Sequence, residues 1–131
     1  MTARPFVVRV GNVAIFPLTS VVYLELVVGQ MEIERLHREL AVDALYFAEP
    51  YPFHPHVTLA QNFDLGTVGE RFAEAQARWR GYTGPREFLL DRAVFVQNTG
   101  NNCWIDLKAF ELKGLPIQQP TTAERRFIQT F

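Results

Sequence analysis

Short apolar stretches, separated by turn-forming residues, alternate along this chain with two longer stretches of helical period. Segments rich in Val, Ile, Leu and Phe favour strands, and Gly, Pro, Asn and Ser mark the breaks between them. Strands are therefore expected at residues 6–14, 21–28, 87–97 and 103–112, and around His56. The first two lie close enough in sequence to form a hairpin.

The two longer stretches carry apolar residues at helical spacing. Over residues 31–44 these residues fall on one stripe, and charged residues cover the other face. In the second stretch Thr67 and Glu70 have the spacing of a capping box at a helix start, and residues 81–85 end the helix. Its expected core stripe consists of Val68, Phe72, Ala75 and Trp79.

The order of elements predicts the fold class. The sequence predicts β-β-α-β-α-β-β, with a five-residue hairpin loop at residues 98–102 and a short helix around residues 123–130. Hairpins at both ends favour an α+β fold, with a largely antiparallel sheet and two helices on one face. We expect one lobe over residues 1–114 and a tail over residues 115–131.

Composition narrows the class of protein further. The 131 residues suffice for one core, and 48% hydrophobic content with 11 Phe indicates an ordered globule. The net charge of −1 argues against binding to duplex DNA, which needs a broad basic surface, but leaves room for one nucleotide or one RNA end.

Cys103 is the only cysteine, so no intrachain disulfide is expected. No membrane-length apolar run and no secretory signal are found, and a cytoplasmic location is the simplest expectation.

The candidate chemistry lies in residues 53–60, Phe-His-Pro-His-Val-Thr-Leu-Ala. Side chains of a strand alternate between faces, so His56 and Thr58 share one face, with Cα atoms about 6.5 Å apart. Val57 and Leu59 are expected to point into the core. The shared face pairs an imidazole that can move a proton near neutral pH with a hydroxyl that can bond a phosphoryl or carbonyl oxygen.

The other histidines are weaker candidates. A His-x-Thr in a strand also arises by chance, and a lone histidine is more often a satisfied surface or core residue. His54 precedes Pro55, where the backbone is restricted to extended geometry, and is expected to help the chain enter the strand. His37 falls in a charged helical pattern and is expected to be solvated.

In this context residues 55–60, Pro-His-Val-Thr-Leu-Ala, resemble the His-x-Thr signature of the two-histidine phosphoesterases. These include 2′-5′ RNA ligase-like proteins and cyclic nucleotide phosphodiesterases. The order of strands and helices is similar as well, and the resemblance covers about residues 6–114. The further matching segments are residues 6–16, 21–26, 88–95 and 104–112.

The resemblance implies attack on a phosphoester at an RNA end or in a cyclic nucleotide, without metal or other cofactor. One histidine takes a proton from the nucleophile, a second gives one to the leaving oxygen, and hydroxyls hold the non-bridging oxygens. His56 would be the proton-transfer residue and Thr58 the phosphate ligand. Tyr51 and Phe53 are candidates to stack on a base, with Phe53 the more suited to core packing.

The chain departs from the family in one respect. Family members have two lobes with one motif each, whereas this chain resembles only the second lobe and has one His-x-Thr. Two chains could form a homodimer about a two-fold axis and share a cleft, with residues 6–10 as the joining edge. Alternatively the chain is a fragment of a longer protein, or a non-catalytic relic that binds a nucleotide or a protein.

Overall fold

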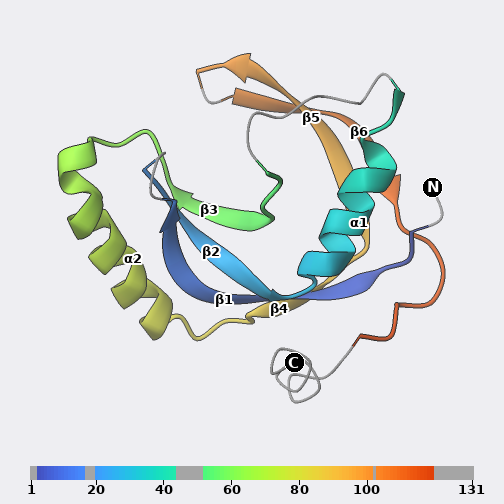
Figure 1. Ribbon diagram of the computed structural model, residues 1–131, viewed down its shortest axis with the longest axis horizontal. Coiled ribbons are helices and arrows are strands. Elements are labelled where there is room, and N and C mark those ends of the chain that lie inside the picture. The colour runs from blue at the N-terminus through green and yellow to red at the C-terminus, as the bar shows by residue number, and fades with distance from the viewer. Residues whose placement is uncertain (1–2, 17–19, 44–51, 102, 120–131) are drawn as a thin grey trace. The chain divides into compact units, whose positions relative to one another are not determined.

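The computed structural model describes residues 3–16, 20–43, 52–101 and 103–119 (Figure 1). Within them the chain forms six strands, two α-helices and one short 3₁₀ helix. These elements are β1 (Phe6–Phe16), β2 (Val21–Val28), α1 (Gln30–Leu40), β3 (His56–Ala60), η2 (Leu65–Thr67), α2 (Val68–Gly81), β4 (Glu87–Leu90), β5 (Arg92–Gly100) and β6 (Cys103–Glu111). The predicted α+β class with an antiparallel sheet and two helices is confirmed.

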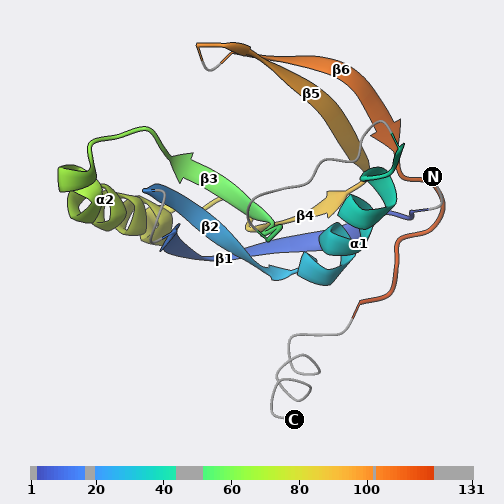
Figure 2. The ribbon, with the colours of Figure 1, turned by 45° about the horizontal axis from the view of Figure 1, so that its top comes forward.

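Four strands form the sheet that carries the His-x-Thr motif, in the order β3-β2-β1-β4 (Figure 2). Strands β1 and β2, and strands β2 and β3, pair antiparallel. The expected joining edge at residues 6–10 is wrong, because β1 lies inside the sheet. Its Val10 amide donates to the Arg86 carbonyl at 2.9 Å, and Phe6 and Val8 are each 1% exposed. The two edge strands of this sheet are instead β3 and β4.

Helix α2 packs against one face of this sheet. The buried residues Val13, Val22 and Leu24 form the centre of the core there. Three of the four predicted stripe residues pack against it, namely Phe72, Ala75 and Trp79. The helical period of the sequence therefore identified the contact face of α2, because apolar side chains at that spacing must leave water together.

The start of α2 differs from the predicted capping box. Thr67 is the N-cap residue but makes no side-chain cap hydrogen bond. Its hydroxyl donates instead to the Asp64 carbonyl at 2.7 Å, and the Asp64 carboxylate accepts from the Gly66 amide. Residues 65–67 form the 3₁₀ turn η2, which directs the Thr67 side chain backwards along the chain.

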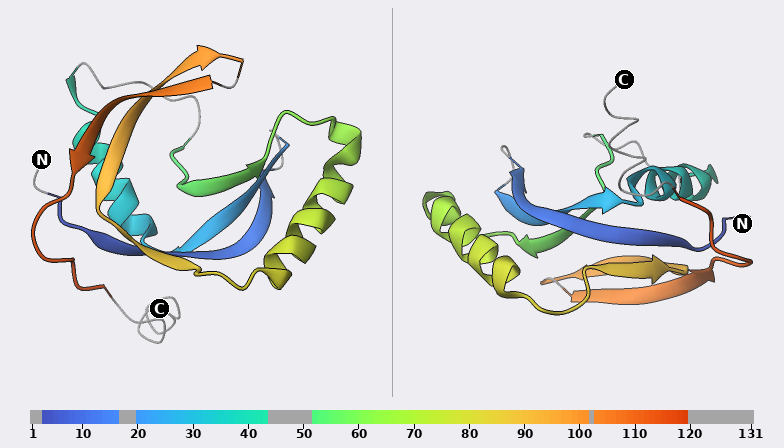
Figure 3. Two further views of the ribbon diagram at one scale, coloured as in Figure 1. Left: turned by 180° about the vertical axis from the view of Figure 1, so that it is seen from behind. Right: turned by 90° about the horizontal axis from the view of Figure 1, so that it is seen from below.

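The expected single strand at residues 87–97 is two strands. The strand breaks at Asp91, so β4 joins the four-stranded sheet and β5 pairs with β6 in a separate two-stranded sheet. Figure 3 shows this hairpin from two further sides. Strand β5 extends to Gly100 and strand β6 begins at Cys103, so the loop between them is shorter than the predicted five residues.

The chain divides into two compact units, residues 8–88 and residues 1–7 with 89–131. In the second unit the N-terminal segment is tied to the segment after β6: the Lys113 and Ile117 amides donate to the carbonyls of Ala3 and Pro5. The first unit contains the four-stranded sheet's β2 and β3, both α-helices and the whole His-x-Thr motif. The predicted helix at residues 123–130 lies outside the described residues.

Candidate functional site

The register of β2 and β3 places the motif on one face of the sheet. Tyr23 lies opposite Thr58, and Glu25 lies opposite His56. Residues paired in this way point to the same side, so these four side chains share a face, as the alternation in β3 predicts for His56 and Thr58. His56 and Thr58 are both exposed, so a solute can reach them.

Aromatic rings orient the His56 imidazole. Its ring meets Phe16 and Tyr23 edge-on, with centroids 5.0 and 5.5 Å apart. Phe16 and Tyr23 stack on each other at 4.0 Å, and the His54 ring meets both of them edge-on as well. Edge-to-face and stacked contacts of this kind favour a defined ring geometry. The imidazole therefore packs against an aromatic pair formed by the end of β1 and the start of β2.

A hydrogen bond to the backbone determines which ring nitrogen of His56 carries the fixed proton and which is left for proton transfer. The Nδ1 atom of His56 lies 2.6 Å from the backbone carbonyl oxygen of His54. A carbonyl oxygen only accepts, so Nδ1 carries the proton in this contact. The Nε2 atom is then the nitrogen that gains or loses a proton. His54 thus does more than the expected help in entering the strand, because its carbonyl sets the tautomer of His56.

The Thr58 hydroxyl is open to a ligand. Thr58 lies two residues after His56 on the exposed face of β3, and among the described residues its side chain makes no hydrogen bond. A hydroxyl can both donate and accept, so it can bond a phosphoryl oxygen held beside the His56 ring.

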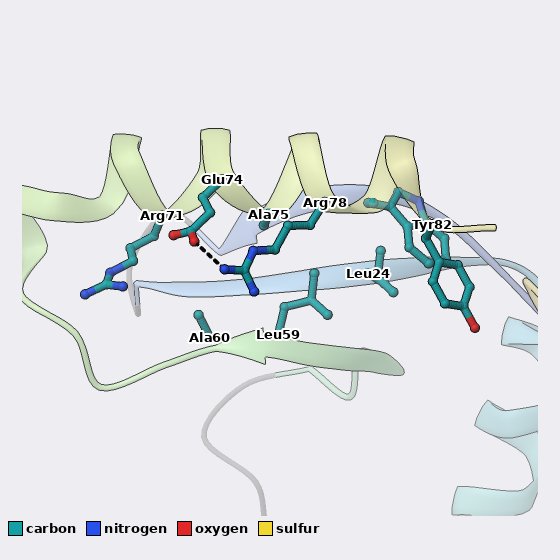
Figure 4. A pocket seen from close by; sticks show the side chains of 9 residues that line it. Leu24, Leu59, Ala60, Arg71, Glu74, Ala75, Arg78 and Tyr82 are labelled. Carbon is teal, nitrogen blue, oxygen red and sulfur yellow. Dashed lines mark hydrogen bonds and ion pairs between the residues drawn. The ribbon is translucent and has the colours of Figure 1, made fainter. Parts of the chain in front are cut away.

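The opposite face of β3 is not core, contrary to expectation. Val57 is 40% and Leu59 43% exposed, and of the residues on β3 only Ala60 packs against the core cluster. A pocket of about 610 Å³ lies there instead (Figure 4). Its lining residues are Leu24, Leu59, Ala60, Arg71, Glu74, Ala75, Arg78, Trp79 and Tyr82.

This pocket is separate from the His56 face. Leu24 and Leu59 line it, and both alternate with the residues that face His56. Arg78 and Glu74 pair at 2.9 Å on its α2 side, with both side chains largely exposed. Such an exposed ion pair is worth little to stability. This pocket and the His-x-Thr motif thus lie on opposite sides of the sheet.

Two other aromatic candidates from the sequence have different outcomes. Tyr51, the expected base-stacking residue, lies outside the described residues. Phe53 stacks on His37 of α1, with ring centroids 3.8 Å apart and an angle of 6° between the planes. His37 is therefore half-buried against a ring, and the expectation that it is solvated is wrong.

Three residues of this face escaped the sequence analysis, namely Phe16, Tyr23 and Glu25. Alternation along β2 puts Tyr23 and Glu25 on one face, but only the register with β3 shows that this is the face of His56. Register depends on the bulges between β1 and β2 and on a shift near Val22, which no local pattern in the sequence reveals. Among the described residues no three His, Cys, Asp or Glu side chains gather as a metal site.

Comparison with known proteins fixes the family. A profile described as the 2′-5′ RNA ligase superfamily matches residues 1–102, which is most of the chain. The chain belongs to the 2′-5′ RNA ligase superfamily. The matched range contains the histidine motif and residues 6–16, 21–26 and 88–95, from which the resemblance was inferred, and it ends before residues 104–112. A search of curated proteins gave no match. In the part of this superfamily member that the structure describes, no helix is long and apolar enough to cross a bilayer.

Proposed function

We propose that this chain is a phosphoesterase that acts on RNA ends or cyclic nucleotides, with His56 as a proton-transfer residue and Thr58 as a phosphate ligand. The observation that carries the proposal is the His56 hydrogen bond to the His54 carbonyl, which occupies Nδ1 and leaves Nε2 for proton transfer, on the strand face that also carries Thr58. Membership of the 2′-5′ RNA ligase superfamily supports an RNA or nucleotide substrate.

The geometry suits phosphoryl chemistry for a physical reason. Cleavage of a phosphoester needs one group to take a proton from the nucleophile and one to protonate the leaving oxygen, and each contributes roughly 10²- to 10⁴-fold. An imidazole whose Nδ1 is held by a backbone carbonyl can use Nε2 either to take a proton or to give one. A neighbouring hydroxyl that binds a non-bridging oxygen would keep the phosphorus within reach of Nε2.

The proposed reaction needs a second proton-transfer group. A second copy of the chain is one source, since a homodimer about a two-fold axis would bring another His56 to the cleft. A side chain of the same sheet is another source, and a first lobe in a longer polypeptide that includes this chain is a third. A dimer would make the rate per chain rise with chain concentration, whereas a group in the same chain would leave it constant.

The test is hydrolysis of a 2′,3′-cyclic nucleotide by the chain in the presence of a chelator. We expect a nucleoside monophosphate as product, and chromatography of the 2′ and 3′ isomers shows which oxygen leaves. NMR titration with the same product should shift the His56 and Thr58 signals. If the folded chain neither turns over the substrate nor binds the product, the proposal is wrong.

Thr58 should affect binding and turnover through its hydroxyl. Thr58→Ala removes a hydrogen bond to a charged group, worth about 1.5–3 kcal/mol, so kcat/KM should fall roughly 10- to 100-fold. Thr58→Ser keeps the hydroxyl and should lose much less. Steady-state kinetics check both, with Thr83→Ala as the matched exposed control. Equal losses in the serine and alanine variants would contradict the phosphate-ligand role.

A non-catalytic binding module of the same fold is the alternative, and the single motif of the chain favours it. It predicts that the product still binds when His56 is replaced and that no substrate is hydrolysed at any chain concentration.

A further inference from the structure

The Tyr23 side chain lies on the candidate face, next to both residues of the motif. It is opposite Thr58 in the β2–β3 register, and residues opposite each other in an antiparallel pair have Cβ atoms about 4.5–5.5 Å apart on the same side of the sheet. The centroid of its ring is 5.5 Å from that of His56. A molecule bound by His56 and Thr58 therefore has Tyr23 as a neighbour.

Contacts on several sides hold the Tyr23 ring. It stacks on Phe16 with 4.0 Å between centroids, and the rings of His54 and His56 both meet it edge-on. Only 8% of the residue is exposed. A ring packed in this way has little freedom to turn, so the fold sets the position of its hydroxyl before any ligand arrives.

The hydroxyl of this ring has no partner in the described part of the chain. The Tyr23 oxygen makes no hydrogen bond there, and it is not a side-chain oxygen that the protein encloses completely. The polar atom of a largely buried Tyr or Trp usually bonds to the protein, as Nε1–H of Trp79 does to the Gly11 carbonyl. Tyr23 instead keeps its donor open to a solute.

Packing alone does not account for this hydroxyl. Phe16, the other ring of the stack, packs there without one. Tyr82 also makes no side-chain hydrogen bond among the described residues, but it is 46% exposed, so water reaches it freely. A nearly buried hydroxyl beside the exposed side chains of His56 and Thr58 is placed to meet a polar group of the molecule that those two bind.

We propose that the Tyr23 hydroxyl is a second phosphate ligand, which donates a hydrogen bond to a non-bridging oxygen of the phosphate that Thr58 also holds. This inference rests on the proposed phosphoesterase function, and it adds a residue from outside the His-x-Thr motif to the site. The need for a second proton-transfer group stays unchanged.

Two hydroxyls on adjacent strands suit a phosphodiester for a chemical reason. Its negative charge is shared by two non-bridging oxygens, and each can accept a hydrogen bond from one hydroxyl. Two donors fix the rotation of the phosphate as well as its position, which keeps the reacting bond aligned with Nε2 of His56. Since the Tyr23 ring is already held, binding costs little side-chain entropy.

The experiment measures binding of a nucleoside 2′-phosphate to the full chain and to Tyr23→Phe by NMR. Tyr23→Phe keeps the ring that Phe16 and both histidines contact and removes only the oxygen. The dissociation constant should rise roughly 10- to 100-fold, as expected for the loss of a hydrogen bond to a charged group. The value of kcat/KM for the 2′,3′-cyclic nucleotide should fall by a similar factor.

A second measurement does not depend on how the variant folds. In the unsubstituted chain with ¹³C at the tyrosine Cζ atoms, the Tyr23 signal should move as the nucleoside 2′-phosphate is added, because Cζ carries the hydroxyl. Tyr82→Phe is the matched control, since it removes a tyrosine hydroxyl from the separate pocket on the other side of the sheet. It should change neither the affinity nor the rate.

Unchanged affinity in Tyr23→Phe, with weaker binding in Thr58→Ala, overturns the inference and leaves the proposed function standing. Equal losses in Tyr23→Phe and Tyr82→Phe overturn it as well, and so does a Tyr23 signal that stays in place while those of His56 and Thr58 move. If the unsubstituted chain neither binds the nucleoside 2′-phosphate nor hydrolyses the cyclic nucleotide, the proposed function itself is wrong.

Discussion

His56→Ala should lower the rate of cyclic-phosphate hydrolysis by roughly 10²- to 10⁴-fold, because it removes a positioned proton-transfer group. The imidazole meets Phe16 and Tyr23 edge-on, and its Nδ1 is held by the His54 carbonyl, so its position is defined by contacts on two sides. The measurement is kcat for the cyclic nucleotide in both proteins, with the product-binding constant determined in parallel.

His54→Ala is the matched comparison. It removes a ring that meets the same two aromatic residues but keeps the backbone carbonyl to which His56 donates. We therefore expect a much smaller loss of kcat than in His56→Ala. A rate that survives in His56→Ala, or equal losses in the two variants, would show that His56 has no special part in proton transfer.

Trp79→Ala should lower the free energy of unfolding by about 3 kcal/mol, the lower end of the usual cost of truncating a large aromatic core residue, because the ring is only partly buried. Trp79 packs against the core of the four-stranded sheet, and its Nε1–H donates to the Gly11 carbonyl at 2.8 Å. The Arg86 guanidinium lies 3.9 Å from the ring centroid, and Tyr82 stacks on the ring. One side chain thus ties α2 to β1 and to the segment before β4.

Urea unfolding followed by circular dichroism measures this loss. Trp79→Phe keeps most of the apolar contact and removes the N–H donor, so it should cost clearly less than Trp79→Ala. Since whole domains have a free energy of unfolding of only about 5–15 kcal/mol, the alanine variant should unfold at a much lower urea concentration. A midpoint close to that of the unsubstituted chain would mean that α2 is not anchored through Trp79.

Local periodicity predicted the elements well and their ends less well. Val21–Val28 and the core stripe of α2 are as expected, because alternation and helical spacing report directly on which side chains leave water. The break at Asp91 was missed because both strands around it are apolar, and only the assembled sheets show that they have different partners. Division of the chain at residue 114 stays a prediction.

Some residues of the candidate site could be predicted from local sequence, and others depend on how the strands assemble. His56 and Thr58 stand two residues apart in one strand, so alternation alone predicts their shared face. Tyr23 and Glu25 come from a strand about 30 residues earlier in the chain, and their side of the sheet relative to His56 depends on register. Val57 and Leu59 were expected in the core, but burial depends on where α2 lies, which the sequence of β3 does not contain.

The His-Pro-His segment has a consequence for how the site assembles. The carbonyl that orients His56 lies only two residues before it, and the Pro55 ring restricts the backbone between them, so this half of the site can form as soon as the local chain does. Tyr23, whose ring the imidazole meets edge-on, reaches the same place only when β2 and β3 pair in register. A slip of one residue would turn Tyr23 to the other face and leave the hydrogen bond between His54 and His56 untouched. Of the contacts that orient His56, the hydrogen bond therefore depends on the local chain alone, whereas the contact with Tyr23 depends on the correct alignment of two strands.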